Sequence, residues 1–467
     1  MAPQLETLSI EQLSPQFTGE LLRQGDSGYD DARLVWNGMF DRRPALIARC
    51  KNTQDVVAAV NFARDNELTI AVRGGGHSAV GYSTCDDGIV IDLGAMSQVE
   101  VDPTTQIVRC GGGATWGQFD AATQEHGLAI TGGRFSTTGV AGLTLGSGSG
   151  WLERKVGLTA DSLIGAELVT ATGDIIRASR DENPELFWGL KGGGGNFGIV
   201  TTFEFKAHKI GPLIYGGMLV SLPDKAPDII AFMRDYMAEA PEDLGIGIAF
   251  VSAPPEPFVP PEMHFKPVSG MIVCWTGSQE EGEKVLAPIR EAAQPVMDMV
   301  GPMPYAALQG MLDGGGPKGI RGYMKAEFMP EINDEAIGKL VSHGGSRPSP
   351  TTQLLLEPMG GAIGNVDDND SAVGRRDIPW CYHALAMWME PGQEAEDAHR
   401  AWAGDLSADM KPNTTTGVYL NFTSDSDEPG RVEQTFGTEK FARLVALKNQ
   451  YDPTNLFHLN QNIKPSS

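Results

Sequence analysis

The sequence predicts an α+β protein of two or three domains, one of which holds an antiparallel sheet backed by helices. The chain has 467 residues, which is too many for one ordinary hydrophobic core. Its 41% hydrophobic and 21% charged residues are typical of a globular protein. Near residue 210, glycine-rich segments give way to apolar strands that alternate with long polar helices. This pattern is typical of a sheet covered by helices on one face.

The first half of the chain is expected to combine short strands, helices and glycine turns. Residues 53–66 carry apolar side chains at helical spacing, with Thr53 as the expected cap. A second helix is expected in "TWGQFDAATQEHG", with Gly127 just past its end. Short strands are expected in "LTIAVR", "GIVIDL", "QVEVDP" and "IVRC", and a hairpin around the turn at 172–174. A short helix, a glycine turn and a strand follow in "NPELFWGLKGGGGNFGIVTTFEF".

The second half predicts the helix-backed sheet. Strands such as "GMIVCWTG", "TQLLLEPMGG" and "YHALAMWME" alternate with helices such as "SQEEGEKVLAPIREAAQ". The tail predicts one more helix and then an asparagine-rich extended end.

Charge and composition disfavour several classes of protein. A net charge of −24 disfavours nucleic acid and anionic membranes as partners, because both require basic clusters. No apolar run reaches the length of about 18 residues that a transmembrane helix needs, and the N-terminus lacks the pattern of a secretion signal. We therefore expect a cytoplasmic protein. No metal site is expected, and the cysteines fit free thiols in a reducing compartment: Cys50, Cys85, Cys110, Cys274 and Cys381.

Glycine runs indicate a phosphate-bearing ligand. Gly193, Gly195 and Gly198 form a G-x-G-x-x-G pattern, but a strand follows it where a nicotinamide site needs a helix. The runs "RGGGHS" and "TTGVAGLTLGSGSG" expose consecutive backbone N–H groups, which bind phosphate oxygens. Two such runs suit a diphosphate attached to a large organic body.

His77 directly follows three glycines. A lone histidine is usually structural or incidental. Here Gly74, Gly75 and Gly76 leave no bulky neighbour beside the imidazole, so a flat cofactor could lie against the loop. A neutral ring nitrogen is also a competent nucleophile for covalent attachment.

Four segments carry a family resemblance. In chain order they are "RGGGHSAVGYSTCDDGIVIDLGAMSQVEVD", "GVAGLTLGSGSGWLERKVGLTADSLIGAELVTATGDI", "NPELFWGLKGGGGNFGIVT" and "YDPTNLFHLNQNIKP". The chain resembles the berberine bridge enzyme-like branch of the p-cresol methylhydroxylase-type (vanillyl-alcohol oxidase) FAD-binding fold. The resemblance implies a two-part FAD-binding domain, formed by 1–209 (with a helical lead-in over 1–40) and 421–467. The substrate-binding domain would be 210–420.

The resemblance also implies which residues hold FAD. His77 matches the histidine that bonds the flavin 8α-methyl carbon. The other implied contacts are Arg73, Gly74, Gly75, Gly76, Ser78, Gly81, Thr137, Gly139, Gly142, Gly146, Gly148, Gly150, Gly198, Val200, Asn460 and Asn462.

Three departures from the family pattern refine this expectation. Phe135 stands where many members have a cysteine that bonds the flavin a second time, so we expect a single bond through His77. We also expect a smaller substrate that is more enclosed by the protein. Ser147 replaces a glycine of the usual run. Thr138 fills the position thought to gate oxygen and is close to valine in shape, so reactivity with oxygen is expected.

The resemblance also bears on the catalytic base. Plant members commonly use the tyrosine of an Asn-Tyr pair, and Phe422 replaces it here. Tyr419 and Asn421 remain, on an expected strand whose alternation points both side chains to one face.

Three more residues complete the candidates for the base. Glu357 lies at the end of an apolar strand, where burial would raise its pKa; a solvated strand end is the alternative. Tyr382 and His383 lie in "IPWCYHALAMW", which resembles a "PFPHR"-like stretch of relatives near the substrate. The order of preference is Glu357, Tyr419, Tyr382 and His383.

The expected function is that of an FAD-dependent oxidase. It would take a hydride from a C–H bond next to nitrogen or oxygen of a small organic substrate and pass the electrons to molecular oxygen. The alternatives are an oxygen-insensitive dehydrogenase, an oxidative cyclase of secondary metabolism, and a flavin-loaded binding protein without turnover. We expect a monomer or homodimer.

Overall fold

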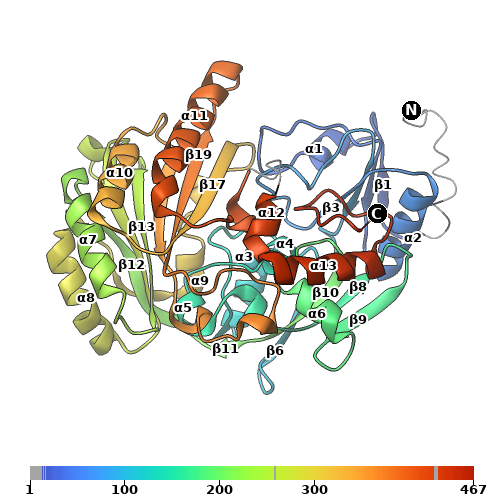
Figure 1. Ribbon diagram of the computed structural model, residues 1–467, viewed down its shortest axis with the longest axis horizontal. Helices are drawn as coiled ribbons and strands as arrows, with labels where there is room; N and C mark the ends of the chain where they lie inside the picture. The colour runs from blue at the N-terminus through green and yellow to red at the C-terminus, as the bar shows by residue number, and fades with distance from the viewer. Residues whose placement is uncertain (1–12, 14, 16, 257–258, 425–429, 467) are drawn as a thin grey trace.

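The computed structural model (Figure 1) describes residues 13, 15, 17–256, 259–424 and 430–466. Two smaller sheets and their helices lie on one side of the molecule, and an eight-stranded sheet with its helices lies on the other. This arrangement confirms the predicted α+β class. Within the described ranges, no helix combines the length and the apolar character needed to cross a bilayer.

The four-stranded sheet positions the loop that carries His77. Its order is β1-β2-β4-β3, with β2 and β3 both parallel to β4. Helix α2 connects β2 to β3, as parallel strands require, and its cap is Asn52, one residue before the predicted one. The chain leaves β3 directly into the first glycine run. The bounds are β1 Glu20–Leu22, β2 Leu46–Arg49, α2 Thr53–Asp65, β3 Ile70–Arg73 and β4 Ile89–Asp92.

The five-stranded sheet is antiparallel and has the order β5-β6-β10-β8-β9. A capping box between Thr115 and Gln118 starts the predicted helix α3, and Gly127, with φ +63°, follows its end. The predicted hairpin is β8–β9. The bounds are β5 Val99–Asp102, β6 Ile107–Gly111, α3 Trp116–Gln124, α4 Val140–Leu145, α5 Glu153–Val156, β8 Leu163–Val169, β9 Ile175–Ser179, α6 Pro184–Leu190 and β10 Ile199–Lys206. A small pair, β7 (Leu128–Ala129) and β11 (His208–Lys209), lies beside it.

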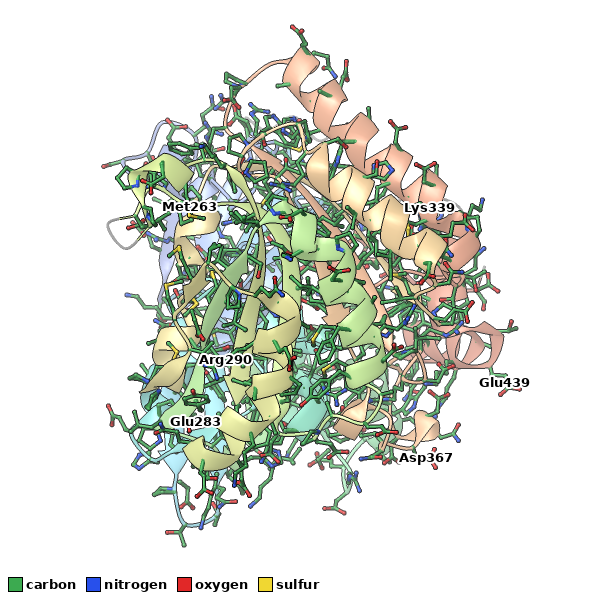
Figure 2. All side chains as sticks on the ribbon, turned by 90° about the vertical axis from the view of Figure 1, so that its left-hand side faces the viewer. Met263, Glu283, Arg290, Lys339, Asp367 and Glu439 are labelled. Carbon is green, nitrogen blue, oxygen red and sulfur yellow. The ribbon has the colours of Figure 1, made fainter. Side chains whose placement is uncertain are left out.

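The eight-stranded sheet has the order β15-β12-β14-β13-β18-β19-β17, with β16 also paired to β12. Helices α7, α8, α10 and α11 cover one face, as Figure 2 shows, and share a large apolar core with it. The bounds are β12 Leu213–Ser221, α7 Ala226–Tyr236, β13 Leu244–Ser252, β14 Pro267–Trp275, α8 Gln279–Ala293, β15 Met297–Asp298, β16 Gly301–Pro304, α9 Tyr305–Gln309, β17 Arg321–Met329, α10 Asp334–Gly345, β18 Gln353–Pro358, β19 Trp380–Trp388 and α11 Gln393–Met410.

Strands β18 and β19 present two different faces. Leu355 pairs with His383, and Leu356 pairs with Tyr382. Because successive side chains on a strand alternate, Tyr382 packs in the core under the helices, whereas His383 lies on the opposite face. That opposite face points toward the glycine-rich half of the molecule.

The two ends of the chain differ from the prediction. The described part of residues 1–40 contains β1 and one five-residue helix, α1 (Tyr29–Arg33), in place of a longer helical lead-in. Tyr419 and Asn421 are not on a strand: a turn closed by the Phe422 N–H and the Tyr419 carbonyl makes a short 3-10 helix, η11 (Leu420–Phe422). The tail has α12 (Arg431–Phe436) and α13 (Thr438–Tyr451), followed by an extended end.

The proposed domain borders fit this topology. Residue 209 ends β11, and the eight-stranded sheet begins at Leu213. Residue 421 lies in η11, where the chain leaves the sheet and returns to the glycine-rich half. The division into 1–209, 210–420 and 421–467 stays a proposal.

Candidate active site

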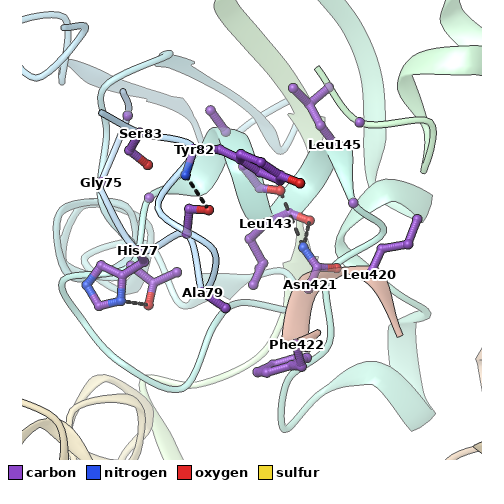
Figure 3. A pocket seen from close by; sticks show the side chains of 18 of the residues that line it. Gly75, His77, Ala79, Tyr82, Ser83, Leu143, Leu145, Leu420, Asn421 and Phe422 are labelled. Carbon is purple, nitrogen blue, oxygen red and sulfur yellow. Dashed lines mark hydrogen bonds between the residues drawn. The ribbon is translucent and has the colours of Figure 1, made fainter. Parts of the chain in front are cut away.

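One large cavity lies between the two halves of the molecule. Its volume is about 310 Å³, within the range of roughly 300–1,000 Å³ that is usual for ligand and cofactor sites. Its walls come from the loop after β3, residues 133–146, residues 192–200, the inner face of β18 and β19, and the chain around 420–423 and 457–461. Figure 3 shows part of this wall. Walls drawn from so many segments suit an extended cofactor that runs from one half of the molecule to the other.

The two predicted phosphate-binding runs touch each other. A Cβ atom on Gly75 would lie 2.2 Å from the backbone nitrogen of Gly139, and one on Gly139 would lie 2.4 Å from that of Gly75. Gly76 has φ +72°, a conformation that side chains disfavour. The glycines therefore allow the runs to form one continuous wall of backbone.

Other glycines leave room at the cavity wall. A Cβ atom on Gly142 or Gly195 would meet no atom within 4 Å, and both residues line the cavity. Asn460 also lines it, and its Oδ1 atom is buried without a hydrogen-bond partner among the described residues. Open glycine surfaces and an unsatisfied amide oxygen fit a flat, polar cofactor such as FAD.

His77 lies where the two runs meet. Its imidazole stacks on Trp36 at 5.1 Å between ring centroids, and Nε2 lies 2.9 Å from Thr137 Oγ1. Nδ1 lies 3.4 Å from Thr138 Oγ1, and Figure 3 shows the His77 side chain at this wall. Burial lowers the pKa of His77 to about 4, with Asp313 opposing the shift. The ring is therefore neutral at physiological pH, which is the form that a nucleophile requires.

The predicted FAD residues fall into two groups. Those that line the cavity are Gly74, Gly75, Gly76, His77, Ser78, Gly139, Gly142, Gly146, Gly198, Val200 and Asn460. Those that do not line it are Arg73, Gly81, Thr137, Gly148, Gly150 and Asn462.

Several members of the second group have other partners. Arg73 forms an ion pair with Asp92 at 2.8 Å. A Cβ atom on Gly81 would lie 2.4 Å from the Phe40 ring, and one on Gly148 would lie 2.3 Å from Thr159 Oγ1. These contacts support the loops from behind the cavity wall.

The C-terminal end is fixed to the cavity by a buried lysine. Lys448 Nζ donates to Asp452 at 2.7 Å and to the carbonyls of Asn196 and Phe457 at 3.0 and 2.9 Å. The Asn196 side chain in turn bonds the backbone of Gln461 and Ile463. This network holds residues 457–461 against the glycine run at 192–195.

Three ionisable side chains form a chain on the opposite wall. Arg134 Nη1 lies 3.1 Å from Glu357 Oε1, and His383 Nε2 lies 2.9 Å from Glu357 Oε2. All three side chains are at least nine-tenths buried and line the cavity. The Arg134 guanidinium also lies over the Trp151 ring at 4.6 Å. Arg134 was missed in the sequence, because no local pattern marks its contact with Glu357.

The predicted raised pKa of Glu357 is wrong. Burial does favour its neutral form, but the Arg134 charge and the close contact with His383 outweigh burial and hold the pKa below its ordinary value. Glu153 shows the opposite result: burial raises the pKa of that carboxyl more than Arg134 lowers it.

The two tyrosine candidates do not line the cavity. The Tyr382 hydroxyl lies on the helix-covered face and donates to Glu327 Oε2 at 2.9 Å. Tyr419 is buried behind the wall, where its hydroxyl accepts a bond from Ser147 at 3.4 Å. Tyr382 faces away because it sits one position from His383 on an alternating strand.

Asn421 and Phe422 do line the cavity (Figure 3). Asn421 Nδ2 donates to the carbonyl of Leu143 at 3.2 Å, and its Oδ1 accepts from the Gly148 N–H at 3.3 Å. Asn421 is thus tied to the second glycine run, while Phe422 packs edge-on against His383 with 4.6 Å between ring centroids.

These features define an FAD-linked oxidoreductase of the berberine bridge enzyme-like family, to which the chain belongs. Residues 44–179 match the model of an FAD binding domain, and residues 418–464 match the berberine and berberine-like domain. The chain is 33% identical to (R)-6-hydroxynicotine oxidase of Paenarthrobacter nicotinovorans, covering 96% of this chain and 97% of the relative. An FAD-linked oxidoreductase of Dictyostelium discoideum is 31% identical over 98% of this chain and 97% of its own.

Solved structures agree with this assignment. The crystal structure of 6-hydroxy-D-nicotine oxidase from Arthrobacter nicotinovorans has a TM-score of 0.86 at 30% identity, and covers 96% of this chain and 98% of that one. A variant of berberine bridge enzyme itself has a TM-score of 0.87 at 19% identity over 99% and 100% of the two chains, which shows the shared fold.

Proposed function

We propose that the protein is an oxidase that carries FAD bonded to His77 and oxidises a C–H bond next to nitrogen or oxygen of a small organic substrate. The observation that carries this proposal is that a single cavity holds a neutral histidine at one wall and a buried group of ionisable side chains at the other. The first wall suits a cofactor, and the second suits a substrate that must lose a proton.

The attachment would use His77 alone. A bond between a ring nitrogen of His77 and the flavin 8α-carbon would form with loss of one hydrogen from each partner, and the flavin itself, reoxidised by oxygen, would supply the two-electron acceptor. Phe135 lines the same cavity and has no group that could form a second bond. A relative of the same fold, glucooligosaccharide oxidase from Acremonium strictum, is described as carrying a 6-S-cysteinyl, 8α-N1-histidyl FAD.

The substrate would bind between the cofactor and the inner face of β18 and β19. Bound FAD supplies a two-electron acceptor for hydride. The chain itself provides apolar surface from Leu355, Leu385 and Met387, and polar groups at Glu357 and His383. These groups would orient a small molecule and provide an acceptor for its proton.

Acid denaturation tests the attachment. The yellow colour is expected to stay with the protein, and a proteolytic peptide containing His77 is expected to carry the mass of FAD. His77→Asn should release its flavin into the supernatant, whereas His264→Asn, at a position outside the cavity wall, should keep it. Free FAD from the wild-type protein would refute the covalent bond.

Anaerobic mixing tests the reaction. A panel of secondary amines, alcohols and phenols, with racemic 6-hydroxynicotine as one member, is expected to include a compound that bleaches the flavin; air should then restore the colour and yield peroxide. Bleaching without peroxide would indicate a dehydrogenase, and a new ring in the product a cyclase. A flavin that no compound bleaches would indicate a binding protein.

A further inference from the structure

The Arg134–Glu357–His383 chain fixes the direction of each of its members. Both oxygens of Glu357 are occupied, Oε1 by Arg134 and Oε2 by His383, at 3.1 and 2.9 Å. A carboxylate that has a guanidinium on one oxygen and an imidazole on the other is stabilised in its charged form, so it is a poor acceptor for a proton from a ligand. The lowered pKa of Glu357 supports the same conclusion, since an easily ionised carboxylate is a weak base.

The contact also sets the tautomer of His383. Its Nε2 lies against a carboxylate oxygen at 2.9 Å; the contact is bent away from linear hydrogen-bond geometry, but the negative charge still favours a hydrogen at this nitrogen. The ring hydrogen therefore resides on Nε2, and the lone pair of the neutral ring resides on Nδ1.

His383 lines the cavity, and its Nδ1 has no hydrogen-bond partner within the described protein. This nitrogen is buried. Phe422 and Tyr419 pack edge-on against the imidazole at 4.6 and 6.2 Å between ring centroids. Neither ring satisfies Nδ1, which is an unusual cost for a buried polar atom.

We propose that Nδ1 of His383 is the base that accepts the substrate proton, and that Glu357 and Arg134 are positioning residues. The proposal rests on the proposed function and deepens it. In this step, the O–H or N–H proton of the substrate would pass to Nδ1. The hydrogen of the neighbouring C–H bond would leave with both bonding electrons, as a hydride, to the oxidised flavin. The carbon–heteroatom single bond becomes a double bond, so protons and electrons balance.

The Arg134–Glu357–His383 group also defines the class of substrate. Within the described part of the chain, the Asp, Glu, Lys and Arg side chains that line the cavity are Arg134 and Glu357, and they neutralise each other. Leu355 and Leu385 flank His383 on the inner face of the sheet. The site therefore fits an uncharged hydroxyl or amine on an apolar body, and offers no free carboxylate to an ammonium group.

The first test observes the tautomer directly in the holoenzyme. Labelling histidine with ¹⁵N and comparing the wild type with His383→Gln assigns the His383 signals. The expected spectrum has hydrogen on Nε2 and a bare Nδ1. Hydrogen on Nδ1, with Nε2 bare, would overturn the proposal.

The second test uses 4-nitrophenol as a probe, because its ionised form absorbs visible light. In difference spectra, wild-type holoenzyme should bind the probe as phenolate below the pH at which the free phenol ionises. His383→Gln should give at least about tenfold less phenolate, equivalent to one pKa unit or more. Glu357→Gln should reduce it and not abolish it. His399→Gln, which removes a buried histidine on α11 that does not line the cavity, should match the wild type.

Two outcomes would overturn the assignment of the base. One is a wild-type enzyme that shows no bound phenolate; the other is full phenolate in His383→Gln together with its loss in Glu357→Gln, which would make Glu357 the base. Neither test requires turnover or oxygen. A failure to find any oxidase activity would therefore count against the proposed function and leave the assignment of the base to be decided by these spectra.

Discussion

Asp313 binds Ser136 through both carboxylate oxygens. The Ser136 hydroxyl donates to Oδ2 at 2.6 Å and its backbone N–H donates to Oδ1 at 2.8 Å. Ser136 belongs to the loop that supplies Thr137 to His77, whereas Asp313 follows α9 in the other half of the molecule. One side chain thus connects the two halves next to the proposed attachment site.

Replacing Asp313 should weaken both the fold and the attachment. Asp313→Ala removes two charge-assisted hydrogen bonds, and we expect a loss of about 1–3 kcal/mol in the free energy of unfolding, because each such bond contributes about that order. Covalent flavin per protein should fall as well, since the loop beside His77 loses its anchor. Denaturant unfolding and acid-stable absorbance measure the two effects. Asp313→Asn, which keeps one acceptor, should fall between Ala and the wild type.

A substitution at a glycine of the cavity wall should reduce cofactor binding without disturbing the fold. A Cβ atom at Gly142 would meet no atom outside its own helix within 4 Å and would point into the room at the cavity wall. Gly142→Leu should therefore leave the flavin-free fold intact or stabilise it by about 0.5–1 kcal/mol through better helix propensity in α4. Its flavin content should drop at least about tenfold, because the side chain takes the room of the cofactor.

Gly148→Ala is the matched comparison. Gly148 has φ +78°, and a Cβ atom there would lie 2.3 Å from Thr159 Oγ1. This variant should lose stability whether or not flavin is present. Thermal unfolding of the flavin-free proteins and flavin absorbance measure both. A Gly142→Leu protein with full flavin content would contradict the placement of FAD along this wall.

Replacing Lys448 should lower the free energy of unfolding far more than replacing a surface lysine that forms the same i,i+4 pair. The Lys448–Asp452 pair is fully buried, and its lysine also satisfies two carbonyls. Lys448→Met leaves Asp452 uncompensated, so we expect a loss of about 3–5 kcal/mol in the free energy of unfolding.

The control has the same spacing on a helix surface. Lys284 and Glu280 form an exposed i,i+4 pair, and Lys284→Met should cost at most about 0.5 kcal/mol. Denaturant unfolding compares the two variants. Equal losses would show that Lys448 does not anchor the C-terminal end.

Asp120 should make the protein less stable as pH rises. Burial raises the pKa of Asp120 to about 7, with the Gln309 amide opposing the shift. Between its ordinary pKa of about 3.9 and 7, the folded protein keeps a proton that the unfolded chain releases, so the free energy of unfolding falls with increasing pH.

Asp120→Asn removes that proton and keeps the carbonyl acceptor. The variant should be more stable than the wild type by about 2–4 kcal/mol at pH 8, and the difference should shrink toward pH 4. Urea unfolding at several pH values measures it, with the exposed Asp181→Asn as control. A difference independent of pH would contradict the titration.

Local patterns predicted the elements that local interactions build. The helix after Thr115 has its capping box within four residues, and the β8–β9 hairpin has its turn in the chain itself. The glycine runs of the cavity wall were recognisable for the same reason, since a run without side chains is visible in any sequence.

Contacts between distant segments could not be predicted in this way. Both Tyr382 and His383 were expected near the substrate, but they are neighbours on a strand whose side chains alternate. The helices that cover one face of the sheet bury Tyr382, so His383 lies at the cavity. Arg134 lies on a loop in the other half of the chain, and its charge reverses the pKa shift that was expected for Glu357. Tyr419 and Asn421 were expected on a strand, but the hydrogen bond that turns the chain at Phe422 has no sequence signature.

The cavity takes its walls from Trp36 near the start of the chain to Gln461 near its end, and Lys448 ties down the last of these segments. The site can therefore close only after residues 457–461 have left the ribosome and joined the other segments of the wall. The proposed attachment of flavin to His77 is then expected to be a late step in the folding of each molecule. A chain cut short before residue 457 is expected to contain His77 and to lack covalent flavin.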